Sequence, residues 1–230
     1  MPSANPLLMQ ATLAVPIILL LVYGYVRQRE NLRTYFDILL MVLPAVILYP
    51  SVARLVPNNA SYATYVYMVL NFIIFVVPAA IVIWSLGYSL RDFGITKDKV
   101  ELSILLGLGA LAITSIFVAL IVPFSPPPFR FSHIFTMSLP MFLDAFREEL
   151  YFRGILFFFV YKNSKDLALS YMVSIATFLL WHQWQPISLV IAFVQGTLMC
   201  YILYKSENIT GAWASRGVDK TLSILVARVI

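Results

Sequence analysis

The residues of this sequence that could do chemistry are ionisable side chains inside long apolar runs. One run contains Glu148, Glu149 and Arg153, and the next contains His182. A carboxylate can act as a general base towards water, and a histidine from a second segment can orient that water or carry a proton. This combination predicts a site for hydrolysis inside a bundle of helices.

The spacing within the first group predicts different roles for the two glutamates. Glu149 and Arg153 are four residues apart, so they share one face of a helix and can form an ion pair. Glu148 is rotated from Glu149 by about 100° around an α-helix. We therefore expect Arg153 to hold Glu149 and to leave Glu148 available.

A third group of charged residues lies in the last apolar run. Arg216 and Lys220 are four residues apart on one helix face, and Asp219 is three residues from Arg216, so it can lie near both. A charged residue at the centre of a membrane helix costs at least roughly 2.5–3.5 kcal/mol. We therefore expect the charged residues of the three runs to face the bundle interior, where they form either a functional site or ion-paired contacts between helices.

The composition predicts the architecture that must position these residues. Of 230 residues, 61% are hydrophobic and 12% are charged, whereas a soluble domain has about 25% charged residues. The mean hydropathy is +0.87. A membrane helix needs roughly 20 apolar residues. The sequence predicts an all-α polytopic bundle of about eight transmembrane helices in a lipid bilayer, with spans near 8–26, 35–54, 62–86, 102–123, 134–161, 167–184, 187–205 and 209–228.

The positive charge favours a membrane orientation and not a nucleic-acid partner. The net charge is +5, and the basic residues lie mainly in the first, third, fifth and seventh loops between the spans. This is the positive-inside pattern, which places those loops in the cytoplasm and both termini outside. We expect a multi-pass protein of the cell membrane. The one cysteine, Cys200, cannot form an intrachain disulfide.

The motifs resemble those of a known family. The residues from Glu148 to Arg153 fit the pattern EExxxR, and those from Phe178 to His182 fit FxxxH. Both patterns, in successive spans, resemble the CAAX-protease and bacteriocin-processing family, also called CPBP or Abi. The resemblance covers roughly residues 85–228. We therefore expect N-terminal transmembrane helices in residues 1–84 and the catalytic core in residues 85–230.

The resemblance implies a glutamic-type intramembrane endopeptidase. It implies that Glu148 activates water, with help from His182, and that Glu149 and Arg153 complete and brace the site. The substrate would be a membrane-anchored or exported protein, reached from the outer face, where His182 is expected to lie.

The sequence departs from the family at its third motif, HxxxN or HxxxD in the last span. Arg216 stands where the histidine is expected, and Lys220 stands where the asparagine is expected. Arg216 could donate to the oxyanion in place of the histidine. Alternatively, a direct salt bridge from Arg216 to Glu148 would occupy the base and favour a non-catalytic protein.

The histidine count also bears on cofactors. A catalytic zinc site usually takes three protein ligands. His182 is the only histidine expected inside the membrane, because His133 is expected in an outer loop. We therefore expect glutamate-activated water without metal or another cofactor, and a zinc site of Glu148, Glu149 and His182 is the alternative. A non-catalytic immunity factor or scaffold is the second functional hypothesis, and a proton-coupled transporter is the third.

Overall fold

The computed structural model describes residues 6–55, 63–121, 131–182 and 186–226. In these ranges the chain is helical and contains no strand. The elements are α1 (Pro6–Arg27), η1 (Arg29–Asn31), α2 (Leu32–Leu55), α3 (Ala63–Ser85), η2 (Leu90–Phe93), α4 (Val100–Ile121), α5 (Phe131–Glu148), η3 (Glu149–Phe159), α6 (Val160–Ser164), α7 (Leu167–Trp181), α8 (Pro186–Ser206) and α9 (Thr210–Val226).

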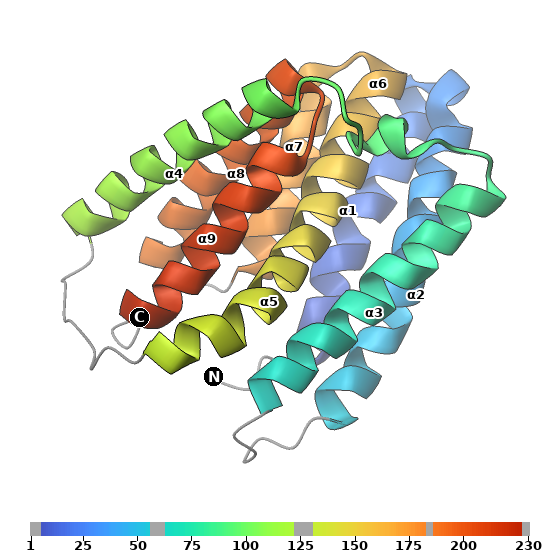
Figure 1. Ribbon diagram of the computed structural model, residues 1–230. Helices are drawn as coiled ribbons and strands as arrows, with labels where there is room; N and C mark the ends of the chain where they lie inside the picture. The colour runs from blue at the N-terminus through green and yellow to red at the C-terminus, as the bar shows by residue number, and fades with distance from the viewer. Residues whose placement is uncertain (1–5, 56–62, 122–130, 183–185, 227–230) are drawn as a thin grey trace.

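These elements confirm the predicted all-α membrane protein. The elements α5, η3 and α6 follow one another without a break, so the described helices correspond to the eight predicted spans (Figure 1). By length and composition, the described helices include four candidate membrane spans, which lie in α2, α3, α4 and α8. The segments that carry the ionisable residues, in α5 and α9, are not among the four. Among the described residues, α9 is 17 residues long, and the end of α5 carries several charged side chains.

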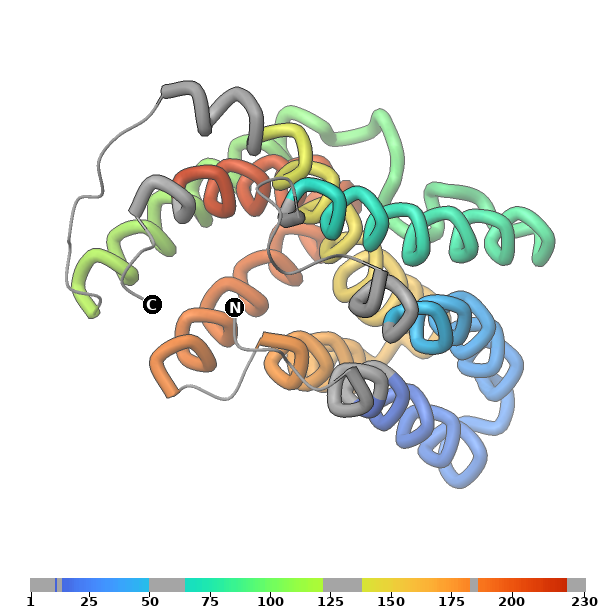
Figure 2. Tube along the Cα trace, turned by 90° about the horizontal axis from the view of Figure 1, so that it is seen from below, coloured from blue at the N-terminus to red at the C-terminus, as the bar shows by residue number. Residues whose placement is uncertain are grey.

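The long helix α5–η3–α6 lies in the middle of the bundle. Seen from one end, it runs between α9, α3, α2 and α7 (Figure 2). It packs against α3 and α9 through α5 and against α7 and α8 through η3. Every residue of η3 is buried. Because its neighbours surround it, the motif Glu148–Arg153 faces protein and not lipid.

One apolar cluster joins the first three helices to the rest of the bundle. It includes Ile17 of α1, Tyr35 of α2 and Phe75 of α3, together with Tyr151 of η3 and Trp181 of α7. The division between residues 84 and 85 stays a prediction. In the structure, side chains from both sides of it pack into the same core.

A tightly hydrogen-bonded corner fixes the start of α9 beside α4. Asn208 donates through its side-chain amide to the carbonyls of Thr96 and Asp98, at 2.8 Å each. The Ser103 hydroxyl donates to the Asn208 carbonyl at 2.7 Å and accepts from the amide of Gly211 at 2.8 Å. A Cβ on Gly211 would lie 1.7 Å from the Ser103 carbonyl oxygen. Only glycine allows this approach, and it sets the position of α9.

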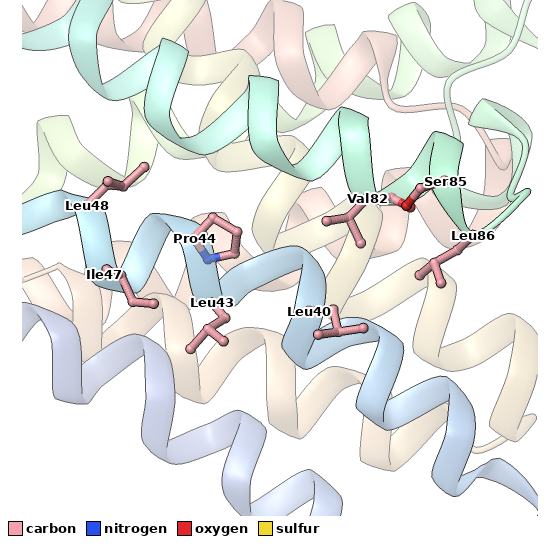
Figure 3. Close-up of a pocket in the computed structure, with 8 residues that line it drawn as sticks. All are labelled: Leu40, Leu43, Pro44, Ile47, Leu48, Val82, Ser85 and Leu86. Atoms are coloured by element: carbon pink, nitrogen blue, oxygen red, sulfur yellow. The ribbon is translucent and has the colours of Figure 1, made fainter.

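A shallow apolar pocket of about 480 Å³ lies between α2 and α3 (Figure 3). Leucine, isoleucine, valine and proline side chains line it, with Ser85 as the polar exception. None of its lining residues belongs to the three charged groups described above. This pocket is therefore separate from the candidate functional site.

Candidate functional site

The two glutamates stand where the central helix changes its hydrogen-bonding pattern. Glu148 is the last residue of α5, and Glu149 is the first residue of the π-helix η3. A π-helix pairs each residue with the fifth one along, and such segments are frequent at functional sites. The sequence predicts an ordinary helix here. The wider turn is a feature that its periodicity did not indicate.

Glu149 and Arg153 form the predicted ion pair, with 3.4 Å between Oε1 and Nη1. Both side chains are almost completely buried, with 0% and 1% exposure. The Arg153 guanidinium also lies 3.9 Å from the centroid of the Phe178 ring, which is a close cation–π contact. Neither charged group has a hydrogen-bond partner among the described residues. This pair is therefore held by charge and packing.

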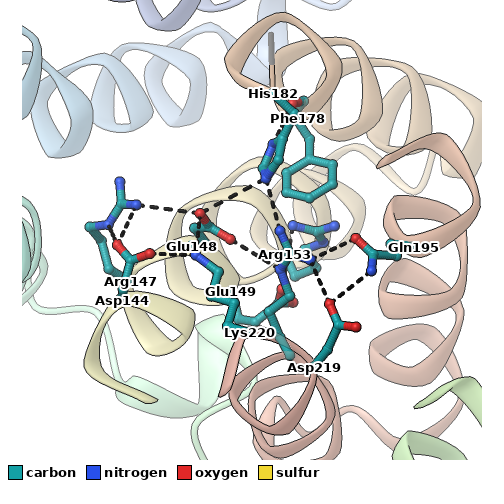
Figure 4. Close-up of polar contacts among 11 residues, drawn as sticks. Asp144, Arg147, Glu148, Glu149, Arg153, Phe178, His182, Gln195, Asp219 and Lys220 are labelled. Atoms are coloured by element: carbon teal, nitrogen blue, oxygen red, sulfur yellow. Dashed lines mark hydrogen bonds and ion pairs between the residues drawn. The ribbon is translucent and has the colours of Figure 1, made fainter. Parts of the chain in front are cut away.

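Glu148 lies on a different side and contacts three cations. Lys220 donates to its Oε1 at 2.7 Å, and Arg216 donates to its Oε2 at 3.2 Å. Arg147 is also within 3.4 Å of Oε1. Figure 4 shows Glu148 at the centre of these contacts. The expectation that Glu148 is left available is wrong for this arrangement, because both of its oxygens are engaged.

His182 joins the same cluster from the end of α7. Its Nδ1 lies 3.0 Å from the Phe178 carbonyl, and its Nε2 lies 2.8 Å from Nη2 of Arg216. A carbonyl can only accept and a guanidinium can only donate, so the neutral ring with its proton on Nδ1 satisfies both contacts. His182 Nε2 lies 4.0 Å from Glu148 Oε1. Glu148 and His182 therefore share one site, as predicted from the sequence.

Arg216 connects the parts of this site. Besides Glu148 and His182, its Nη1 donates to Gln195 at 2.6 Å and to Asp219 at 3.1 Å. Gln195 in turn donates to Asp219 at 2.9 Å. The spacing in the sequence predicts that Arg216 and Asp219 lie close together, but it does not predict the contact with Gln195. The signal that could have found it is a polar amide inside the apolar run that became α8.

The other ionisable residues of the central helix also take part. Asp144 accepts from Arg147 at 2.6 and 2.9 Å and from Lys220 in a short contact. Arg147 lies over the rings of Phe75 and Trp181, at 4.9 and 5.3 Å from their centroids. Helices α3 and α7 therefore orient Arg147 towards the carboxylates.

The cluster as a whole is balanced in formal charge. Four cations meet four anions in it: Arg147, Arg153, Arg216 and Lys220 against Asp144, Glu148, Glu149 and Asp219. With His182 neutral, their sum is zero. A balanced cluster satisfies the requirement that charges buried in a membrane protein are paired.

Two contacts with α5 bring α9 into register with the glutamates. The Trp213 indole donates to the Phe142 carbonyl at 2.8 Å. A Cβ on Gly217 would lie 2.5 Å from the Phe142 ring, so the missing side chain lets the helices approach. With α9 fixed in this way, Arg216 and Lys220 reach Glu148.

The described residues contain no group of three or more His, Cys, Asp and Glu side chains arranged to hold a metal. The zinc alternative requires Glu148, Glu149 and His182. Arg216 and Lys220 already engage both oxygens of Glu148, and Arg216 engages Nε2 of His182. His133 lies in the first turn of α5 and not in a loop, and its side chain is outside the described part. The expectation of glutamate-activated water without metal stays a prediction.

Comparison with known proteins supports the resemblance seen in the sequence. Residues 113–219 match the family model described as "Type II CAAX prenyl endopeptidase Rce1-like". The matched region includes both glutamates, His182 and Arg216, and it ends one residue before Lys220. No curated protein and no solved structure matches the chain.

Proposed function

We propose, from the premise that this chain belongs to the Rce1-like family of CPBP membrane endopeptidases, that it hydrolyses a peptide bond with water activated by Glu148. The observation that carries the proposal is the meeting of three groups from three helices. His182 Nε2 is 4.0 Å from Glu148 Oε1, and the Arg216 guanidinium contacts both side chains. A base, a second proton-handling group and a hydrogen-bond donor therefore lie within reach of one reacting carbonyl.

The proposed reaction assigns one role to each group. Glu148 takes a proton from water as the water oxygen attacks the substrate carbonyl. The carbonyl oxygen becomes an oxyanion, and the guanidinium of Arg216 donates to it. The peptide C–N bond then breaks, and the leaving amine takes the proton from Glu148. His182 orients the water, while Glu149 and Arg153 brace the helix behind Glu148.

The proposed substrate is a membrane-anchored or exported protein. The His182 side chain is 21% exposed, whereas that of Glu148 is 4% exposed, so the site is more open at the His182 end. In the orientation predicted from the loop charges, this end of α7 faces outside. A substrate would then reach the site from the outer side of the membrane.

A comparison of protein N-termini in cells tests this proposal. A deletion strain would be complemented with the wild-type protein, with Glu148→Gln or with Glu101→Gln, and all N-termini would be compared. Glu101 is an exposed glutamate in the first turn of α4 and serves as the matched control. We expect new N-termini in exported or membrane-anchored proteins with the wild type and Glu101→Gln, and none with Glu148→Gln. Processing unchanged in Glu148→Gln would contradict the mechanism.

A non-catalytic role is the second candidate, and one observation favours it. Arg216 and Lys220 engage both oxygens of Glu148, and Arg216 also takes Nε2 of His182. A base in such contacts is occupied until the cations move. If the deletion strain lacks no N-terminus that the wild-type strain has, the chain acts by binding a partner in the membrane and not by proteolysis.

A further inference from the structure

Each of the two cations on α9 has a second anionic partner besides Glu148. Lys220 donates both to Glu148, at 2.7 Å, and to Asp144 in a shorter contact. Arg216 donates both to Glu148, at 3.2 Å, and to Asp219, at 3.1 Å. Neither aspartate stands at a position that the three motifs of the resemblance specify, yet the two aspartates duplicate the pairing of both cations.

The charge count gives this duplication a reason. The HxxxN form of the family pattern has a histidine and an asparagine where this chain has Arg216 and Lys220. Relative to that form, with its histidine neutral, the site holds two additional positive charges. Asp144 and Asp219 contribute two negative charges against these same side chains. Asp144 is 8% exposed and Arg216 is 6% exposed. A buried cation without a partner is strongly destabilising, so these pairs are needed whether or not Glu148 takes part.

The contacts of Gln195 show how Arg216 can stay in place without Glu148. Gln195, from α8, accepts from Nη1 of Arg216 at 2.6 Å and donates to Asp219 at 2.9 Å. The guanidinium therefore has an anchor on α8 and another within α9. Lys220 has a comparable anchor on α5, because Asp144 is itself oriented by Arg147.

We propose that Asp144 and Asp219 are positioning residues that hold Lys220 and Arg216 by ion pairs of their own, so that Glu148 can release both cations and accept a proton from water. The catalytic part of this inference rests on the proposed function. The pairing part concerns the folded protein alone. In the absence of either aspartate, the cation it holds depends on Glu148, and the base stays occupied.

Neutralising first one and then both members of an ion pair tests the inference. Asp144→Asn should destabilise the protein, because it leaves an excess positive charge in the site. Adding Lys220→Asn, which restores the family's residue, should recover most of the loss by removing the unpaired cation. Asp219→Asn and Arg216→Gln form the second such set. If each substitution acted only by disturbing local packing, the double variants would be less stable than the single variants.

Stability can be followed through the one cysteine of the chain. Cys200 is buried, so a maleimide that fluoresces on reaction reports unfolding of the full-length protein in detergent during heating. We expect Asp144→Asn and Asp219→Asn each to lower the midpoint of thermal unfolding by on the order of 5 °C. We expect the double variants to recover more than half of that fall. The control is Asp98→Asn, in the exposed pair with Arg91, for which we expect a change under about 2 °C.

The rate of processing of a protein found by the N-terminal comparison gives the second readout. Asp144→Asn should slow processing about tenfold or more, the equivalent of one charge-assisted hydrogen bond. Adding Lys220→Asn to Asp144→Asn should restore part of the rate.

Three outcomes would contradict parts of the inference. If the falls in thermal midpoint of the two single variants simply add in the double variant, the positioning role is refuted. If the wild type processes nothing but the double variants recover stability, the proposed function fails and the pairing stands. If stability recovers but an active wild type loses no rate in Asp144→Asn and Asp219→Asn, the release of Glu148 is refuted.

Discussion

Glu148 and Glu149 are neighbours in the chain, but the structure gives them opposite surroundings. Glu148 contacts Arg147, Arg216 and Lys220, on its own helix and on α9. Glu149 has one ion pair among the described residues, with Arg153, beneath the Phe178 ring. One step along a helix turns the side chain by about 100°, which is enough to place the two carboxylates among different helices.

The difference separates a carboxylate with exchangeable partners from a carboxylate with a fixed one. Around Glu148, hydrogen bonds from several donors can replace one another. Around Glu149, the loss of Arg153 would leave a fully buried charge with no other described partner. Removing one member of a buried pair costs more than the pair contributes. We therefore expect the loss of Arg153 to affect mainly stability, and the loss of one cation from Glu148 to affect mainly chemistry.

The largest effect should come from Arg153→Leu. The substitution leaves Glu149 buried without its cation, which costs about 3–5 kcal/mol, and the expected result is a large fall in folded yield and in the thermal midpoint. Adding Glu149→Gln should recover much of this loss, because no charge then remains unpaired. Arg91→Leu, at an exposed pair, is the control. A double variant no more stable than Arg153→Leu would show that the pair is not what holds this side of the site.

An intermediate effect should come from Arg216→Ala, on the Glu148 side. Removing one oxyanion donor usually slows turnover about 10²–10³-fold, while Lys220 and Arg147 still pair with Glu148. We expect processing to fall by about that factor and the thermal midpoint to change less than in Arg153→Leu. Arg216→His should keep part of the activity, since it restores the family's residue. Processing at the wild-type rate in Arg216→Ala would remove this residue from the mechanism.

The smallest effect should come from Gly196→Ala on the Glu149 side. The added Cβ would lie 3.2 Å from the Phe178 ring and 3.6 Å from Nη2 of Arg153. Such crowding costs about 1–3 kcal/mol, and the better helix propensity of alanine offsets about 1 kcal/mol of it. We expect a net fall of roughly 2–4 °C in the thermal midpoint. Gly109→Ala in α4 meets nothing within 4 Å and should be slightly stabilising, as alanine favours a helix. If Gly196→Ala slows processing without lowering the midpoint, the two glutamates are not separated as we describe.

Several features of the site could be predicted from the sequence because they depend on one helix at a time. The pairing of Glu149 with Arg153 follows from a spacing of four residues, and the nearness of Asp219 to Arg216 follows from a spacing of three. The approach of His182 to Glu148 followed from the cost of exposing either group to lipid. The salt bridge between Arg216 and Glu148 was one of two alternatives for Arg216, and the sequence could not decide between them, because Arg216 comes from α9 and Glu148 from α5.

The amino-acid sequence by itself determined the helical membrane fold, the approximate ends of the spans and the resemblance to the family, since these depend on local runs of apolar residues and on short motifs. Only the tertiary structure decided that Arg216 and Lys220 bind Glu148 directly. That outcome depends on how closely α9 approaches α4 and α5 at Gly211 and Gly217. The tertiary structure also decided that the π-helix begins at Glu149. Distances between helices are set by packing across the whole bundle, and no spacing within one segment encodes them.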